Sequence, residues 1–229
     1  MPTTILITGA NRGIGRGLLE AYVLKPNTTV IAGVRDVASS EKSLSSVKLG
    51  TGSKIITVKL DSADKTGAKV AVEELTTEHD DVVIANAGIA KYWGTVLDSP
   101  SEEFVEHYNA TWSLLDRVAS PKFVVITSFL GSITGIDNFP IPDAAYASSK
   151  AAINFIARKL HFEHEKLLVV TINPGWVQTD MGNAGAAANG LAEAPVTLQE
   201  SVTGIVSKVD DVTPATSGSF SYDETESSW

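Results

Sequence analysis

The sequence contains no cysteine in its 229 residues. Disulfide bonds, thiolate metal sites and cysteine nucleophiles are therefore excluded. It also has no run of about 18 consecutive apolar residues, which a membrane-spanning helix would need. The N-terminus lacks the basic and apolar leader that is typical of a secretory signal. We therefore expect a cytoplasmic protein that does not engage a membrane.

Basic residues are also few. Lys and Arg number 18 against 27 acidic residues, a formal net charge of −9, which argues against a nucleic-acid-binding surface. His161 and His164 stand close together, but they lie among charges on a segment with helical spacing, and no carboxylates of ligand spacing accompany them. We therefore predict a solvated helix face there, no metal site, and a small molecule as the partner.

Short apolar runs alternate with segments of helical spacing along the chain. This alternation predicts βαβ units and a parallel sheet, and runs that are apolar throughout are typical of strands covered on both faces. We therefore predict a single α/β domain over residues 1–229, a doubly wound (Rossmann) parallel sheet of about seven strands with helices on both faces. The expected strands are 4–7, 29–34, 54–60, 81–85, 123–127, 167–172 and 218–222, and the expected helices are 18–24, 39–46, 63–78, 145–165, 197–209 and one that begins at Ser101.

Two segments do not fit this alternation. Residues 182–194 are rich in small side chains, and we expect a flexible loop there, either a lid that closes over a substrate or an ordinary surface loop. Residues 223–229 form an acidic C-terminal tail.

A glycine-rich turn follows the first expected strand and precedes the first expected helix, with the sequence Thr8-Gly-Ala-Asn-Arg-Gly-Ile-Gly15. Glycines there let the backbone approach a ligand closely, and the N-terminus of the new helix attracts a phosphate. The spacing differs from the common Gly-x-Gly-x2-Gly pattern, and a plain tight turn is the alternative. The candidate cofactor-binding residues are Gly9, Asn11, Arg12, Gly13, Ile14 and Gly15.

Polar or glycine residues follow each of the first six expected strands. In a doubly wound sheet the carboxyl ends of the strands line the ligand crevice. Six independent loops of this composition are a poor explanation, so we predict one site. Its members at the later strand ends are Arg35, Asp61, Ser62, Asn86, Ala87, Gly88, Ser128, Pro174 and Gly175.

Tyr146 and Lys150 stand four residues apart on an expected helix and therefore share a face. A phenol has a pKa of about 10, and a nearby positive charge lowers that pKa toward the range where general acid–base catalysis works. Ser128 could hold a substrate oxygen opposite the tyrosine. The alternative is a surface tyrosine with a neighbouring lysine.

Together these motifs resemble the short-chain dehydrogenase/reductase family. The glycine turn, Asn86-Ala-Gly88, Ser128, Tyr146-x3-Lys150 and Pro174-Gly-Trp-Val-Gln-Thr179 occur in the family's order over nearly the whole chain. The segment from Pro174 and the C-terminal segment also resemble a subgroup, the sniffer-like or C-factor-like carbonyl reductases, which includes fungal ketoreductases of the norsolorinic acid type.

The resemblance implies a role for each motif residue. Tyr146 would exchange a proton with the carbonyl oxygen, Lys150 would lower the pKa of Tyr146 and hold the nicotinamide ribose, and Ser128 would orient the carbonyl. Asn109 matches the family's helix asparagine, which positions a water that links Lys150 to solvent. Further implied cofactor ligands are Val177 and Thr179 at the carboxamide, Asp61 at the adenine and Asn86 to Gly88 beside the adenosine.

The choice of cofactor depends on the end of the second strand. An acidic residue there selects NAD(H), whereas an arginine accommodates the 2′-phosphate of NADP(H). The usual acidic position is occupied by Val34, Arg35 follows, and Arg12 in the glycine turn is a second candidate phosphate ligand. We predict NADP(H) in preference to NAD(H). The alternative is that Arg35 pairs with Asp36 or with another surface acid.

The chain departs from the family after Asn109, which stands only 19 residues before Ser128. Relatives have a longer helix in this segment, and in many of them it builds a dimer interface, so a homodimer stays an open question. The mouth of the pocket is expected to be apolar or aromatic, although some of its side chains could instead belong to the core. Its candidates are Trp93, Phe129, Phe139, Trp176 and Met181.

The predicted function is reduction of a ketone or aldehyde to an alcohol by direct hydride transfer from NADPH, in a setting such as polyketide metabolism. The alternative is an NADP-binding regulator or scaffold with weak catalysis, although Ser128, Tyr146 and Lys150 are all present. A sugar epimerase is disfavoured by the glycine spacing and by the lack of a long C-terminal substrate region.

Overall fold

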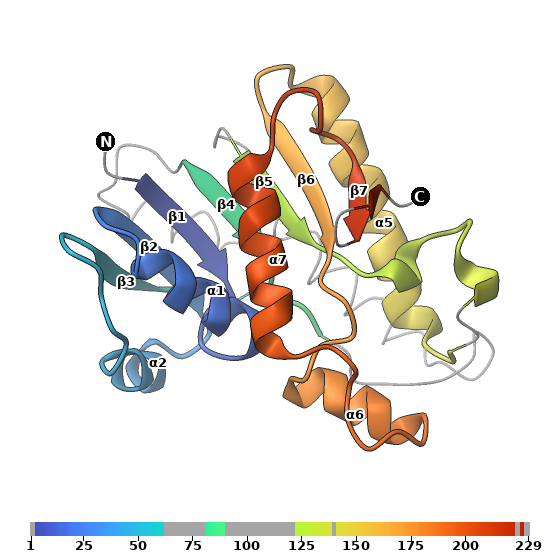
Figure 1. The fold of residues 1–229 in the computed structure, drawn as a ribbon, viewed down its shortest axis with the longest axis horizontal. Coiled ribbons are helices and arrows are strands. Elements are labelled where there is room, and N and C mark those ends of the chain that lie inside the picture. The colour runs from blue at the N-terminus through green and yellow to red at the C-terminus, as the bar shows by residue number, and fades with distance from the viewer. Residues whose placement is uncertain (1–2, 62–80, 90–121, 139–140, 223–224, 227–229) are drawn as a thin grey trace.

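The computed structural model describes residues 3–61, 81–89, 122–138, 141–222 and 225–226. Their centre is an eight-stranded sheet in the order β3-β2-β1-β4-β5-β6-β7-β8, parallel except for the antiparallel β8 (Figure 1). The strands are β1 Thr3–Thr8, β2 Thr28–Val34, β3 Lys54–Lys59, β4 Val82–Ala85, β5 Lys122–Ile126, β6 Leu168–Asn173, β7 Phe220–Tyr222 and β8 Thr225–Glu226.

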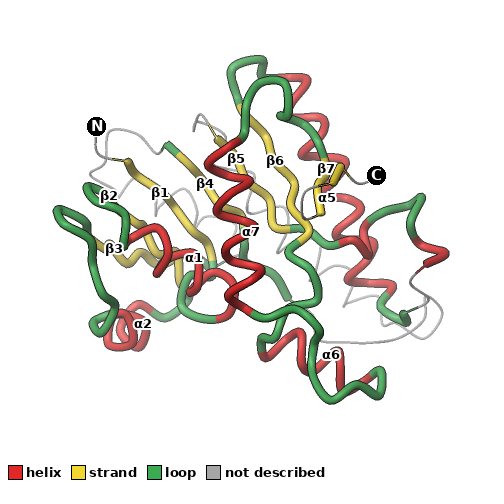
Figure 2. The backbone as a smooth tube through the Cα atoms, viewed as in Figure 1, coloured by secondary structure: helices red, strands yellow, loops and turns green. Residues whose placement is uncertain are grey.

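Helices flank this sheet and connect its strands (Figure 2). The α-helices are α1 Gly13–Val23, α2 Val37–Leu44, α5 Ala144–Glu163, α6 Asp180–Ala188 and α7 Leu198–Asp211. Two short 3-10 helices, η2 Phe129–Gly131 and η3 Ile136–Asn138, lie between β5 and α5. Within the described residues, no helix is long and apolar enough to cross a membrane.

Alternation of side chains along β1 builds the core on both faces of the sheet. Ile5 and Ile7 pack in one cluster with side chains of α1 and α7, while Leu6 packs in a second cluster with side chains of α5. Both faces are therefore apolar, which explains why the strands read as continuous apolar runs. The doubly wound α/β fold predicted from the sequence is confirmed.

The order of the strands fixes the place of the site. β1 pairs with β2 on one side and with β4 on the other, so the chain reverses direction across the sheet between β3 and β4. A doubly wound sheet binds its ligand at such a switch point, beyond the carboxyl ends of the strands. Here that point lies between the ends of β1 and β4.

The expected loop at 182–194 is partly wrong, because α6 extends to Ala188. Thr179 caps this helix by accepting a hydrogen bond from the Gly182 N–H at 3.1 Å. Alanine is the strongest helix former, and its repetition here outweighs the glycines. The tail is also partly ordered, since Thr225–Glu226 pairs with β7. The expected helices 63–78 and from Ser101 lie outside the described residues.

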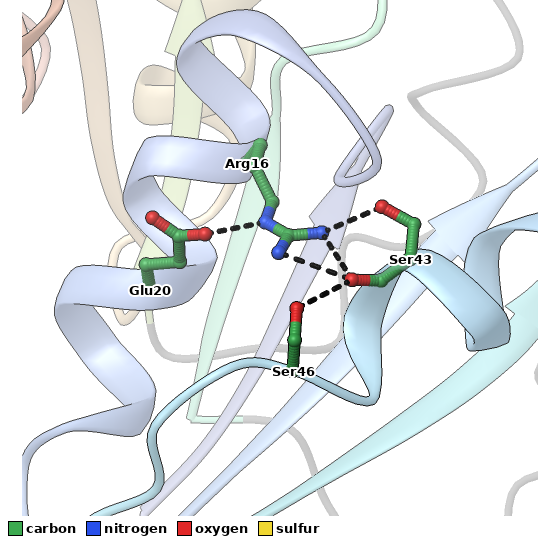
Figure 3. A network of polar contacts seen from close by, with 4 residues as sticks. All are labelled: Arg16, Glu20, Ser43 and Ser46. Atoms are coloured by element: carbon green, nitrogen blue, oxygen red, sulfur yellow. Dashed lines mark hydrogen bonds and ion pairs between the residues drawn. The ribbon is translucent and has the colours of Figure 1, made fainter.

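Arg16 joins α1 to the C-terminal end of α2 (Figure 3). Its Nε donates to Glu20 Oε1 at 2.6 Å, and its two terminal nitrogens donate to the Ser43 carbonyl oxygen at 3.4 and 3.3 Å. Ser46 Oγ donates to the same carbonyl at 3.3 Å. A cation at the negative end of a helix is favourable, so Arg16 stabilises α2 against α1, next to the end of β2.

Substitution of Phe123 tests how much the apolar cluster between the sheet and α5 contributes to stability. Its ring is 0% exposed on β5, and Phe123→Ala removes it from the second cluster, so we expect a loss of about 3–5 kcal/mol in the free energy of unfolding. Chemical denaturation measures this loss. Phe155→Ala on α5, where the ring is 71% exposed, is the control and should change stability by less than about 0.5 kcal/mol. Equal effects of the two substitutions would contradict the assignment of the core.

Candidate active site

The glycine turn between β1 and α1 forms a cradle with room for a ligand against its backbone. Gly9 and Gly13 have φ values of +66° and +53°, which disfavour any residue with a side chain. A Cβ on Gly15 would lie 2.3 Å from the Gly9 carbonyl oxygen, so this position also requires glycine. Asn11 and Arg12 are exposed in the turn, and Ile14 is half-buried in α1.

The end of β4 is fastened to the end of β1 beside this turn. Asn86 Nδ2 donates to the Thr8 carbonyl oxygen at 2.9 Å. The backbone N–H groups of Asn86 and Ala87 both donate to Thr8 Oγ1, at 3.1 and 2.9 Å. Asn86 and Ala87 therefore hold the glycine turn in place, and Gly88 continues from them toward Lys150.

Two exposed arginines, Arg12 and Arg35, lie in the glycine turn and directly after β2. Arg12 is the N-cap residue of α1, makes no capping bond with its side chain, and has its guanidinium 4.0 Å from Asp180 Oδ2. Arg35 is exposed after β2. The Asp36 carboxylate accepts from the Ser39 N–H at 3.1 Å as the N-cap of α2, so it is already engaged in capping that helix.

The glycine cradle fits a dinucleotide. The cradle would be filled by a Cβ at Gly15, and the first turn of α1 points backbone N–H groups at the space in front of it. The half-buried Asp61 follows β3 at the same edge of the sheet. The glycine turn, the first turn of α1 and Asp61 could therefore hold the phosphates and ribose of such a cofactor.

Ser128, Tyr146 and Lys150 converge at the end of β5, as predicted. The Tyr146 side chain is hydrogen-bonded to Ser128. Lys150 Nζ donates to the Ile126 carbonyl oxygen at 3.0 Å and lies 5.4 Å from the centroid of the Tyr146 ring. A Cβ on Gly88 would lie 3.8 Å from Lys150 Nζ, so the Lys150 ammonium lies beside the β4 end of the cradle.

Burial sets the ionisation of these groups. It raises the pKa of Tyr146 to about 12, while the hydrogen bond to Ser128 lowers this pKa and the charge of Asp143 raises it. The expectation of a lowered Tyr146 pKa is therefore wrong for this structure, since the effect of burial exceeds any effect of the neighbouring lysine. Burial also lowers the pKa of Lys150, to about 8.

Close packing holds α5 against the end of β5. A Cβ on Gly131 would lie 2.6 Å from the Lys150 carbonyl carbon, so the two segments touch backbone to backbone. Thr127 Oγ1 donates to Asn154 Oδ1 at 2.6 Å, and Asn154 Nδ2 donates to the Gly131 carbonyl oxygen at 3.3 Å. Asn154 was not predicted from the sequence. The only indication was its position four residues, or one helical turn, after Lys150.

The segment after β6 brings a further wall to the cradle. Gly175 has a φ of +81°, and its N–H donates to Asn173 Oδ1 at 3.3 Å. A Cβ on Gly13 would lie 3.4 Å from Thr179 Cγ2, so this segment reaches the glycine turn. Ser201 Oγ on α7 donates to the Pro174 carbonyl oxygen at 2.8 Å, and Val177 is buried.

Several predicted residues can be placed only in part. Trp176 is half-buried, and its Nε1 donates to the Gly182 carbonyl oxygen at 2.8 Å. Met181 is exposed and Phe129 is half-buried against Gly135. The remaining candidates lie outside the described residues: Ser62, Trp93, Asn109 and Phe139.

Sequence reasoning also missed Asp143. This residue precedes α5, is 5% exposed, and has a carboxyl pKa that burial raises to about 6. No partner for its Oδ2 is found within the part of the chain that the structure describes. Its position three residues before Tyr146 was the only signal in the sequence.

The chain is similar to known proteins over most of its length. The family described as short chain dehydrogenase matches residues 3–189. The norsolorinic acid ketoreductase of Dothistroma septosporum is 43% identical over 237 residues, which cover 95% of this chain and 88% of that protein.

Two solved structures share the fold. The NADPH-bound carbonyl reductase from chicken fatty liver superposes with a TM-score of 0.82 at 26% identity, covering 100% of this chain and 94% of that one. The carbonyl reductase Sniffer of D. melanogaster has a TM-score of 0.81 at 23% identity and full coverage of both chains. The resemblance inferred from the sequence is thereby confirmed, and the chain is an oxidoreductase that belongs to the short-chain dehydrogenase family.

Proposed function

We propose that this protein reduces a ketone or an aldehyde to an alcohol, with NADPH as the hydride donor and with Tyr146, Ser128 and Lys150 as the catalytic group. The observation that carries the proposal is the hydrogen bond between Tyr146 and Ser128 with the Lys150 ammonium on the same face of α5. A carbonyl oxygen placed between the two hydroxyl groups accepts a hydrogen bond from both, which polarises the carbonyl.

Tyr146 acts as the general acid. With a pKa of about 12 it is protonated at neutral pH, which is the state that donates a proton to the carbonyl oxygen. As the proton leaves, negative charge develops on the phenol, and the Lys150 ammonium 5.4 Å from the ring centroid stabilises it. The bond from Lys150 Nζ to the Ile126 carbonyl oxygen keeps the ammonium in this position.

The nicotinamide of NADPH, when bound, supplies the hydride. The cofactor would be held at its phosphates by the glycine turn and the N-terminus of α1, and at its ribose by Lys150. Arg12 and Arg35 would pair with the 2′-phosphate, since a guanidinium binds phosphate through two parallel hydrogen bonds. The 26% identical chicken enzyme, which binds NADPH, supports the same cofactor here.

The relatives support an aromatic or otherwise bulky ketone as the substrate. A norsolorinic acid ketoreductase that covers most of this chain at 43% identity is consistent with a role in fungal polyketide metabolism. Cofactor binding without turnover of any ketone would instead favour the alternative function, an NADP-binding regulator.

Tyr146→Phe tests the general acid. Removal of the hydroxyl should lower kcat by about 100- to 10,000-fold, because general acid–base catalysis contributes a factor of this size. The affinity for NADPH should stay within about threefold. NADPH oxidation with a panel of aromatic ketones measures the rate, and Ser148→Ala on the same helix is the control. A Phe variant as active as the wild type would rule out this role.

Arg35→Ala tests the choice of cofactor. Loss of a charge-assisted bond to the 2′-phosphate should raise the KM for NADPH by about 10- to 100-fold, while the KM for NADH stays the same. Lys42→Ala removes an equal charge from exposed α2 and is the matched control. An unchanged preference for NADPH in the Arg35 variant would contradict the proposed phosphate contact.

The pH dependence of reduction tests Lys150. Burial lowers its pKa to about 8, so the ammonium is present below this pH and is lost as the pH rises through it. Steady-state kcat for carbonyl reduction should therefore fall above about pH 8. In Lys150→Arg, whose charge persists at every working pH, the residual activity should not show this fall. An identical alkaline limb in both proteins would assign it to another group.

A further inference from the structure

Asn154 is a buried polar residue to which the proposed reaction assigns no role. It is 3% exposed on α5, one helical turn after Lys150, and therefore shares a face of the helix with that residue. Its Oδ1 accepts a hydrogen bond from Thr127 Oγ1 at 2.6 Å, and its Nδ2 donates to the Gly131 carbonyl oxygen at 3.3 Å. Since a carbonyl oxygen only accepts, Gly131 determines that the nitrogen of the amide faces it and that the oxygen faces the Thr127 hydroxyl.

The two partners of Asn154 flank Ser128 in the chain. Thr127 directly precedes Ser128 and is 1% exposed. Gly131 follows three residues after Ser128, and its N–H donates to the Ser128 carbonyl oxygen at 3.0 Å. Between them, the Leu130 N–H donates to Ser128 Oγ at 3.2 Å. Asn154 therefore holds both ends of the short segment that carries the Ser128 hydroxyl.

This segment lies beyond the point at which Lys150 holds the strand. The hydrogen bond from Lys150 Nζ reaches the carbonyl oxygen of Ile126, two residues before Ser128. Lys150 thus joins α5 to the end of β5, and Asn154 joins the next turn of α5 to the chain that follows β5. The position of Ser128 relative to the helix that carries Tyr146 depends on this second link.

We propose that Asn154 is a positioning residue, which fixes the Ser128 hydroxyl against α5 so that a carbonyl oxygen can lie between Ser128 and Tyr146. The inference rests on the proposed reductase function and adds to it a residue that acts through Ser128. Hydrogen-bond donors to a reacting oxygen contribute most when they are held in place before the reaction. A displacement of about 1 Å can lower a rate by about 100-fold.

Asn154→Leu removes both hydrogen bonds and keeps a side chain of similar size. The assay uses the full-length protein, NADPH, and acetophenone or its three ring-hydroxylated isomers. In this variant kcat and kcat/KM should fall together by about 10- to 100-fold, because a misplaced Ser128 weakens binding of the transition state. The Kd for NADPH should stay within about threefold of the wild-type value, since the contacts of Asn154 do not include the glycine turn.

A double-mutant cycle with Ser128→Ala shows whether the effect passes through Ser128. In the Ser128→Ala background, Asn154→Leu should lower kcat by less than about twofold, because no hydroxyl is left to misplace. The same loss in both backgrounds would mean that Asn154 acts on Tyr146, on Lys150 or on the fold as a whole, and would overturn the inference.

Thr127 offers a second, milder test that does not depend on the folding of the Asn154 variant. Thr127→Val removes one of the two hydrogen bonds with little change of shape and should lower kcat by about 3- to 30-fold, whereas Thr127→Ser, which keeps the hydroxyl, should retain the wild-type kcat. The matched control is Thr171→Val on β6, which removes a buried hydroxyl that donates to the Ser219 carbonyl oxygen at 2.7 Å. It should lower the unfolding midpoint by about 2–4 °C, as Thr127→Val does, and leave kcat unchanged.

The outcomes distinguish this inference from the proposed function. A wild-type kcat in Asn154→Leu, or equal losses of kcat in Thr127→Val and Thr127→Ser, overturns the positioning role and leaves the reductase function standing. A loss of kcat in Thr171→Val as large as that in Thr127→Val assigns both losses to stability and also overturns it. Failure of the wild type to oxidise NADPH with any of these ketones overturns the reductase function and the positioning role together.

Discussion

The hydrogen bonds that join the end of β4 to the end of β1 determine how the rest of the site is built. Thr8 supplies both acceptors, its carbonyl oxygen and its Oγ1, to Asn86 and Ala87. The Asn86 amide then occupies the space where a side chain at position 15 would lie, since a Cβ there would be 2.5 Å from Asn86 Nδ2. Glycine is therefore required at position 15 both by the Gly9 carbonyl oxygen, 2.3 Å from such a Cβ, and by the polar link at the switch point. The same β4 segment continues to Gly88, beside Lys150 Nζ, and so joins the glycine turn to the group that we propose as catalytic.

Burial moves the ionisation of Tyr146, Asp143 and Lys150 in one direction, toward their neutral forms. The pKa values of Tyr146 and Asp143 are raised and that of Lys150 is lowered, and desolvation is the largest cause in each case. For Tyr146 this direction suits reduction, which needs a protonated donor. For Lys150 it means that the ammonium is lost as the pH rises through about 8, where the pKa lies. The exclusion of water therefore makes the Lys150 ammonium easier to deprotonate. Its hydrogen bond to the Ile126 carbonyl oxygen keeps Nζ in place near the Tyr146 ring.

The sequence predicted those features that depend on spacing and failed on those that depend on burial. The strands were found because both faces of the sheet are apolar, and the turn at Gly9 to Gly15 and the pair Tyr146 and Lys150 were found because their spacing reflects helix and turn geometry. The direction of the Tyr146 pKa could not be found, since spacing gives the proximity of a lysine but not the loss of water around the phenol. Asp143 was missed for the same reason, because an aspartate before a helix usually indicates an exposed cap. The helix α6 was not predicted because its glycines favour a loop, and the high helix propensity of the neighbouring alanines was given too little weight.

The relative positions of the three catalytic side chains depend on one rigid unit. Ser128 directly follows the end of β5, Lys150 is anchored to the carbonyl oxygen of Ile126 in that strand, and Gly131 allows the backbone of α5 to approach it. Asn154 links both sides through Thr127 and the Gly131 carbonyl. These contacts all form between residues 126 and 154. A catalytic group held this way is preorganised before the substrate arrives.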